Sequence, residues 1–201
     1  MGEQYYYFAS RDRSIRHSGH RCIEEGMTHT VEPSLDQCDH ALHAYRRAID
    51  ALRYAHGPVI CIAELGGEIL HGDKRSISTE RTYLEVIDGE ALISEFCRRC
   101  GLDTMELWER LFGERGATRD RLEAGNEGMR EWTWYQAWNA PRAAAGAAVA
   151  AASPVSALER ATRGTTTPQT SLFNVYDEKM EEYNGWLEQM IADKIKEDRN
   201  G

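Results

Sequence analysis

Two charged pairs and two polar side chains carry most of the chemistry that this sequence could perform. They are Asp73-Lys74, Glu80-Arg81, His43 and Tyr54. If these groups line one pocket, they form a site for an anion or a nucleotide, to which Arg11 adds a further positive charge. If they do not, the charged pairs are ion pairs in a turn and on a strand face. Exposed pairs of that kind contribute only about 0–1 kcal/mol each.

His43 itself has two interpretations. A histidine in a buried strand is more commonly hydrogen-bonded to backbone groups, and it then has a structural role. The alternative is a ligand-binding or catalytic histidine, because imidazole titrates near neutral pH. The sequence leaves both open.

The cysteines and histidines do not have the spacing of a known metal site. Zinc needs about four ligands that converge at about 2.0–2.3 Å. The candidate ligands are Cys22, Cys38, His17, His20, His40 and His43. Cys97-x-x-Cys100 matches one half of a zinc site, but a second half is missing, and we interpret both cysteines as packing residues. We therefore expect no metal.

Composition limits the classes of partner. The chain has 201 residues, 41% of them hydrophobic and 28% charged, with a net charge of −9. These values indicate a globular core and argue against broad electrostatic binding to nucleic acid or to an anionic membrane. No apolar run approaches the roughly 20 residues of a membrane span. The N-terminus lacks an apolar signal segment, and with reduced cysteines expected we predict a cytoplasmic protein, in the host cell if a phage encodes it.

The first half of the chain predicts a small sheet that packs on one helix. Aromatic and β-branched residues indicate strands at 5–9, 27–31, 41–45, 59–65 and 77–86. Apolar residues at helical spacing indicate a helix at 46–55, which Gly57-Pro58 ends. We expect Gly66-Gly67 to interrupt a strand and residues 73–75 to form a turn. No GxGxxG or Walker pattern is present to make this glycine pair a phosphate loop.

The second half predicts helices. One runs from about residue 88 to Gly101, and a second begins at Asp103 or Thr104 and ends at Gly113. The predicted fold class is α+β: a small mixed or antiparallel sheet with one packed helix, then a helical C-terminal region. The predicted divisions are an α/β core domain at 1–88, a helical region at 89–163 and an amphipathic helix at 171–197. An aromatic group follows the second helix and is either core or a partner surface; it comprises Trp132, Trp134, Tyr135 and Trp138.

The last helix has the most regular pattern. Its apolar residues step by three and four, as in a coiled-coil seam. They are Phe173, Tyr176, Met180, Tyr183, Leu187 and Met190. Such a seam packs on a neighbouring helix of the same chain or on a second copy, so homo-oligomerisation through this helix is one expectation.

Several segments resemble a family of uncharacterised phage and prophage proteins. They are Cys38-x-x-Ala41-Leu42-His43-Ala44, Asp50-Ala51-Leu52-x-Tyr54-Ala55-x-Gly57, Gly67-Glu68-Ile69, Asp73-Lys74 and Glu80-Arg81-Thr82. Arg98-Arg99-Cys100, Leu107-Trp108 and an Ala/Trp-rich stretch follow in the family's order. The resemblance covers roughly residues 10–150, and Ala41 replaces the family's glycine. It implies a phage origin but no activity.

A weaker resemblance is to the core of ADP-ribosyltransferase-like enzymes. It implies NAD as cofactor, with Arg11 or His17 as the early NAD-clamping residue. It also implies catalytic roles for His43, Tyr54 and Glu80, of which Glu80 stabilises the oxocarbenium-like centre. The usual Ser-Thr-Ser run is absent, and so is the usual Glu-x-Glu or Gln-x-Glu motif.

The leading hypothesis is a phage-encoded protein without a cofactor that binds a host or phage protein, for example to inhibit a host defence system. The alternatives are the NAD-using enzyme and an oligomerising adaptor. An open cleft that joins His43, Tyr54 and Glu80 favours the enzyme, whereas exposed apolar side chains favour binding.

Overall fold

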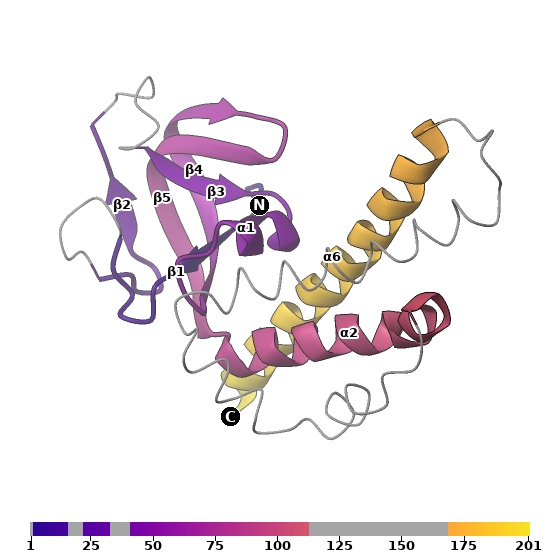
Figure 1. Ribbon diagram of the computed structural model, residues 1–201. Coiled ribbons are helices and arrows are strands. Elements are labelled where there is room, and N and C mark those ends of the chain that lie inside the picture. The colour runs from indigo at the N-terminus through magenta and orange to yellow at the C-terminus, as the bar shows by residue number, and fades with distance from the viewer. Residues whose placement is uncertain (1, 16–21, 33–40, 113–168) are drawn as a thin grey trace.

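The computed structural model describes residues 2–15, 22–32, 41–112 and 169–201, and side chains in these ranges except those of 101, 104–112 and 169–176. Within them the fold is α+β, as predicted, with an antiparallel sheet and helices that include one at the C-terminus (Figure 1). The aromatic group at 132–138 lies outside the described residues, and so do Cys38 and His17.

The sheet has the strand order β2-β5-β3-β1-β4, and β4 also pairs with β5. All of these pairings are antiparallel. Because β5 pairs with both β3 and β4, the ladder β5-β3-β1-β4 returns to its own first strand. The strands are β1 (Tyr5–Ala9), β2 (Thr28–Thr30), β3 (Leu42–Tyr45), β4 (Val59–His71) and β5 (Arg75–Asp88).

Alternating residues of β1 and β4 supply two hydrophobic clusters. Successive side chains of a strand point to opposite faces. Phe8 and Ile60 therefore join the cluster that the helices cover, whereas Tyr7 and Cys61 join a second cluster on the other face. The prediction that 59–63 is a strand buried on both faces is confirmed, because all five residues are buried.

The glycine pair in β4 bends the strand, and the prediction of a break there is wrong. β4 runs through Gly66 and Gly67 to His71, with a register shift between Gly66 and Ile69. Gly67 has φ 65°, and a Cβ built on it would lie 2.1 Å from Thr79 Oγ1. Only glycine fits a left-handed bulge that approaches its neighbour so closely.

The first helix, α1 (Ala48–Arg53), is shorter than predicted, and its N-terminus is capped by another helix. Arg47 at the N-cap position makes no side-chain capping hydrogen bond. The backbone N–H of Ala48 instead donates to Glu188 Oε1 (3.3 Å), and that of Ile49 donates to Asn184 Oδ1 (3.1 Å). Two N–H groups without a partner inside α1 are thus satisfied from the C-terminal helix.

The second helix, α2 (Glu90–Phe112), is one continuous helix, so the predicted division at Gly101 is wrong. Glycine ends a helix when it adopts a left-handed conformation. Among the described glycines only Gly26 and Gly67 have positive φ. Phe96 and Cys100, both fully buried, anchor α2 in the core on the N-terminal side of Gly101.

The C-terminal helix, α6 (Gln169–Asn200), packs against α1 and α2 and crosses α2 in Figure 1. Met180, Tyr183, Leu187 and Ile191 are buried in the helix-covered cluster. The buried stripe of the seam is therefore covered by the chain itself. It continues through Ile191, while Met190 is only partly buried.

Candidate functional site

The three residues proposed as catalytic do not form one site. His43 lies opposite Ile77 of β5, and Glu80 lies three residues further along β5. Directly opposite residues share a face and successive residues alternate, so the His43 and Glu80 side chains point to opposite faces. Tyr54 follows α1, is 56% exposed and stacks on Tyr45. The register thus contradicts the proposed constellation.

Arg81 is not available as a surface anion ligand. Its side chain is 1% exposed, and its guanidinium lies 3.8 Å from the centre of the Tyr7 ring. Nη1 donates to the His43 carbonyl oxygen (2.6 Å), while Nη2 and Nε donate to Tyr83 Oη (2.7 and 3.1 Å). Burial by itself lowers the pKa of Arg81, but Tyr7 and Tyr83 outweigh that effect and the pKa is raised. The expected Glu80–Arg81 ion pair is wrong, because Arg81 points into the core.

The hydrogen bonds from Arg81 also determine the direction in which the Tyr83 hydroxyl donates its own hydrogen. Burial raises the pKa of Tyr83 to about 12, so the side chain is a neutral phenol near pH 7. A phenol oxygen has two acceptor sites and one hydrogen. Arg81 donates to that oxygen twice, so the hydroxyl hydrogen is free to donate to His29 Nδ1, 3.0 Å away. This network joins β2 to β5 in addition to the backbone ladder.

The remaining cations of the predicted anion site lie elsewhere. Arg11 pairs with Glu90 at the start of α2 (2.7 Å), which ties the loop after β1 to that helix. Lys74 lies in the exposed turn of the β4–β5 hairpin. Arg11, Lys74 and Arg81 therefore do not converge on one ligand.

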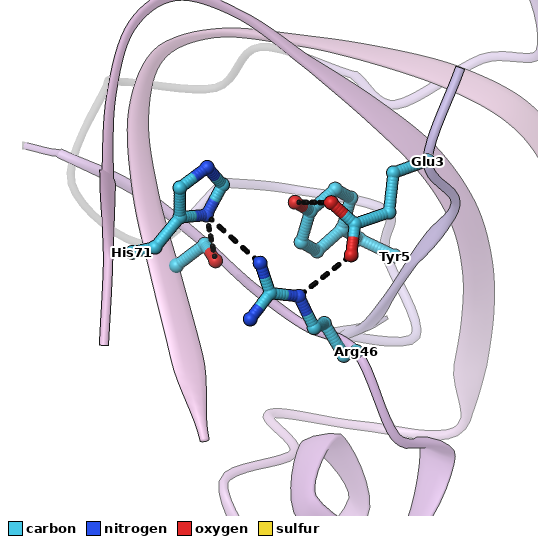
Figure 2. Close-up of polar contacts among 5 residues, drawn as sticks. Glu3, Tyr5, Arg46 and His71 are labelled. Atoms are coloured by element: carbon cyan, nitrogen blue, oxygen red, sulfur yellow. Dashed lines mark hydrogen bonds and ion pairs between the residues drawn. The ribbon is translucent and has the colours of Figure 1, made fainter. Parts of the chain in front are cut away.

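A polar cluster that sequence reasoning missed joins the hairpin to the N-terminal segment. Figure 2 shows Glu3, Tyr5, Arg46 and His71 pointing toward one another. Glu3 accepts hydrogen bonds from Tyr5 Oη (2.7 Å) and Arg46 Nε (2.6 Å), and these two bonds lower the pKa of Glu3. His71 Nδ1 lies 3.4 Å from Arg46 Nη2 and 3.0 Å from Ser76 Oγ. No local motif connects residues so distant in the sequence.

This cluster is suited to positioning and not to nucleophilic catalysis. His71 and Ser76 are residue types that act in some enzymes as the base and the nucleophile, respectively. Ser76, however, is only 1% exposed, so a substrate has no access to its hydroxyl. Arg46 is neutralised by Glu3. The cluster therefore links the hairpin to the segments that precede β1 and α1.

The hairpin end, which we define as residues 66–75, exposes apolar side chains. Ile69 is 38% and Leu70 is 55% exposed. In the part of the chain that the structure describes, Tyr54 is the other large hydrophobic residue that is exposed. The hairpin end lies at the top of Figure 1, away from α2 and the C-terminus.

Within the part of the chain that the structure describes, the outer edge of β4 is open along the hairpin end. β1 pairs with β4 only at residues 59–63. The Gly72 N–H donates to the Arg75 carbonyl (2.9 Å), which makes 72–75 a hydrogen-bonded pair. Hydrogen-bonded and non-hydrogen-bonded pairs alternate along an antiparallel ladder. The backbone groups of Leu70 therefore face those of Ile77, whereas the N–H and C=O groups of Ile69 and His71 point away from β5. Among the strands of the described ranges, none pairs with residues 66–71 of β4 on that side.

The prediction that the seam of the last helix is a binding surface is wrong for its buried residues. Met180, Tyr183 and Leu187 are in the core and have no free surface in this conformation. The side chains of Phe173 and Tyr176 lie outside the described part of the chain. Cys97 and Cys100 pack in or against the core, as predicted, and burial raises the pKa of both thiols.

Three further observations assign no function to this protein. Within the described ranges, His, Cys, Asp and Glu side chains do not gather in threes in a way that holds a metal ion. The helices of these ranges also lack the combination of length and apolar content that a bilayer span requires. Compared with protein families, with curated proteins and with solved structures, this chain has no match.

Proposed function

We propose that this protein acts by binding another protein, and that the hairpin end is its contact surface. The observation that supports the proposal is the exposure of Ile69 and Leu70, two consecutive aliphatic residues, on a part of β4 whose outer edge is not paired by any strand in the described ranges. Because consecutive side chains of a strand point to opposite faces, the two residues present one exposed apolar side chain on each face of the hairpin beside this edge.

The sequence of this edge strengthens the argument. Sheet edges that must stay free usually carry lysine, proline or a covering segment, because an open edge pairs readily with other chains. Residues 64–68, which read ELGGE, carry charges and a bulge of the kind that protects an edge, whereas residues 69–71, which read ILH, contain no lysine, proline or bulge. The Glu3–Arg46–His71 cluster links the hairpin to the segments that precede β1 and α1, and such links reduce the conformational entropy that the hairpin loses on binding.

The resemblance of residues 10–150 to phage and prophage proteins extends the proposal to the kind of partner. It suggests a protein of a bacterial host, such as a component of an antiviral defence system. The net charge of −9 is compatible with a basic partner.

The experiment is affinity capture from a bacterial lysate with two matched variants. Leu70→Asp places a charge on the proposed surface, and Tyr54→Asp places the same charge on an equally exposed residue elsewhere. We expect the wild type and Tyr54→Asp to retain one protein that Leu70→Asp loses by at least tenfold, with unchanged circular dichroism. Equal capture by all three forms, or no specific capture, refutes the proposal.

A further inference from the structure

We infer that the partner of this protein contributes an extended, basic segment that pairs with β4 as an additional strand at Ile69 and His71. This inference deepens the proposed function, since it assigns the binding mode and the chemistry of the occupant. It depends on the open edge of β4 and on the charges beside that edge.

The backbone supplies the first argument. The N–H and C=O groups of Ile69 and His71 point outward, as the alternation from the Gly72–Arg75 pair requires. These groups are spaced two residues apart, which is the repeat that an added strand needs. Strand addition uses main-chain hydrogen bonds for affinity and alternate side chains for specificity. Ile69 and Leu70 offer one apolar contact on each face of the new strand.

The negative charges beside the edge of β4 favour a basic segment as the added strand. Glu64, Glu68 and Glu80 belong to the two hairpin strands, and the ion pairs found in the described ranges include none of the three. Glu80 lies opposite Gly66, and its Oε2 would be 3.0 Å from a Cβ at that glycine. Because Glu64 and Gly66 share a face, two of the carboxylates lie on one face of the hairpin. A lysine or arginine of an added strand finds unpaired carboxylates there, whereas an acidic segment is repelled.

A defined peptide tests this mode without knowledge of the natural partner. The probe is a blocked nine-residue peptide of alternating valine and lysine, and the control probe has glutamate in place of lysine. We expect the full-length protein to bind the lysine peptide at least tenfold more tightly than the glutamate peptide, with affinity that falls as salt rises. Equal binding of both peptides, or of neither, overturns the inference.

Two substitutions at one position separate the backbone from the side chain. Ile69→Ala removes most of the side chain and keeps the N–H, whereas Ile69→Pro also removes an N–H that β5 does not use. Strand addition predicts that Ile69→Pro lowers lysine-peptide affinity at least tenfold below that of Ile69→Ala. Equal affinities of the two variants contradict it.

A measurement on the wild-type protein covers the case in which Ile69→Pro does not fold. Amide hydrogen exchange at Ile69 and His71 should slow at least tenfold when the lysine peptide is added, because those N–H groups become bonded. Unchanged exchange at both positions overturns the inference.

The carboxylates are tested with a charge-matched control. Glu64→Gln, Glu68→Gln and Glu80→Gln combined change the net charge by three, and so do Asp177→Asn, Glu178→Gln and Glu197→Gln on α6. We expect the hairpin triple to weaken lysine-peptide binding at least tenfold and the α6 triple by less than threefold. Equal effects mean that only the net charge matters, which rejects a site at this edge.

The failure of this inference is distinguishable from the failure of the proposed function. If Leu70→Asp loses the captured protein while Ile69→Pro keeps it, the hairpin end binds through side chains, and strand addition is wrong. A second copy of the chain is the other possible occupant. A concentration-dependent dimer in sedimentation that Ile69→Pro abolishes assigns the edge to self-association and also overturns the inference.

Discussion

Asn184 Oδ1 accepts the backbone N–H of Ile49 at 3.1 Å, so a side chain near the end of the protein caps a helix in its first quarter. Both residues are buried, and Glu188 repeats the arrangement at Ala48. α1 has six residues, which is too short to be stable without tertiary support. The capping contact therefore couples α6 to α1, which in turn packs on β1.

This contact predicts the effect of Asn184→Ala. The substitution leaves the Ile49 N–H buried without an acceptor, so the free energy of unfolding should fall by about 1–3 kcal/mol. Urea unfolding measures the change. Gln189→Ala, at an exposed position of the same helix, should change it by less than about 0.5 kcal/mol. A similar loss in both variants would show that the cap contributes nothing specific.

Two glycines should respond to alanine in opposite directions. Gly67→Ala forces a left-handed conformation and a contact with Thr79 Oγ1, so stability should fall by about 1–3 kcal/mol. Gly185 lies in α6, is exposed and has open space where an alanine methyl group would lie. Gly185→Ala should therefore raise stability by about 0.5–1 kcal/mol. Thermal and urea unfolding of both variants check the signs, and an equal sign in the two would contradict the assignment of the bulge.

Stability should decline at alkaline pH. Burial raises the pKa of Tyr6, Tyr45 and Tyr83 to about 12. An unfolded tyrosine loses its proton near pH 10, before the folded one does, so the unfolded state gains stability as pH rises. The stabilisation is complete below pH 10 and is lost between about pH 10 and 12, at roughly 1–3 kcal/mol for each of the buried Tyr45 and Tyr83 and less for the half-buried Tyr6.

The measurement is urea unfolding at several pH values, combined with tyrosinate absorbance. Burial also raises the pKa of the Cys61 and Cys100 thiols to about 12, so these groups add a decline in the same direction that begins near pH 9. Tyr83→Phe should have lower stability at pH 7, since Arg81 loses an acceptor, but a shallower decline above pH 10. A flat stability between pH 10 and 12 would contradict the burial of these phenols.

The sequence could predict those parts of the fold that depend on local pattern. The aromatic run at residues 5–9 and the apolar run at 59–63 are strands because their side chains can be buried on a sheet. The turn at Asp73-Lys74 was also predictable from its polar residues. The three-and-four spacing of Met180, Tyr183 and Leu187 indicated a helix face that packs on a neighbour.

The errors share a physical cause, because each concerns a residue whose role depends on a distant neighbour. In the sequence, Gly66-Gly67 is typical of a strand break, and only the close approach of Thr79 shows why a strand needs glycine there. Gly101 is typical of a helix end, but α2 continues through it. Arginine is usually a surface residue, but the contacts of Arg81 with Tyr7 and Tyr83 compensate for the cost of burying its charge. The Glu3–Arg46–His71 cluster joins three segments that no local pattern relates.

The capping of α1 by α6 also has a consequence for synthesis on the ribosome. Ile49 precedes Asn184 by 135 residues, which at about 5–20 residues per second corresponds to roughly 7–27 seconds of translation. During that interval the emerging chain cannot complete its core. Nascent polypeptides that stop before residue 184 would expose the apolar side of the sheet, and we expect chaperones and proteases to remove them.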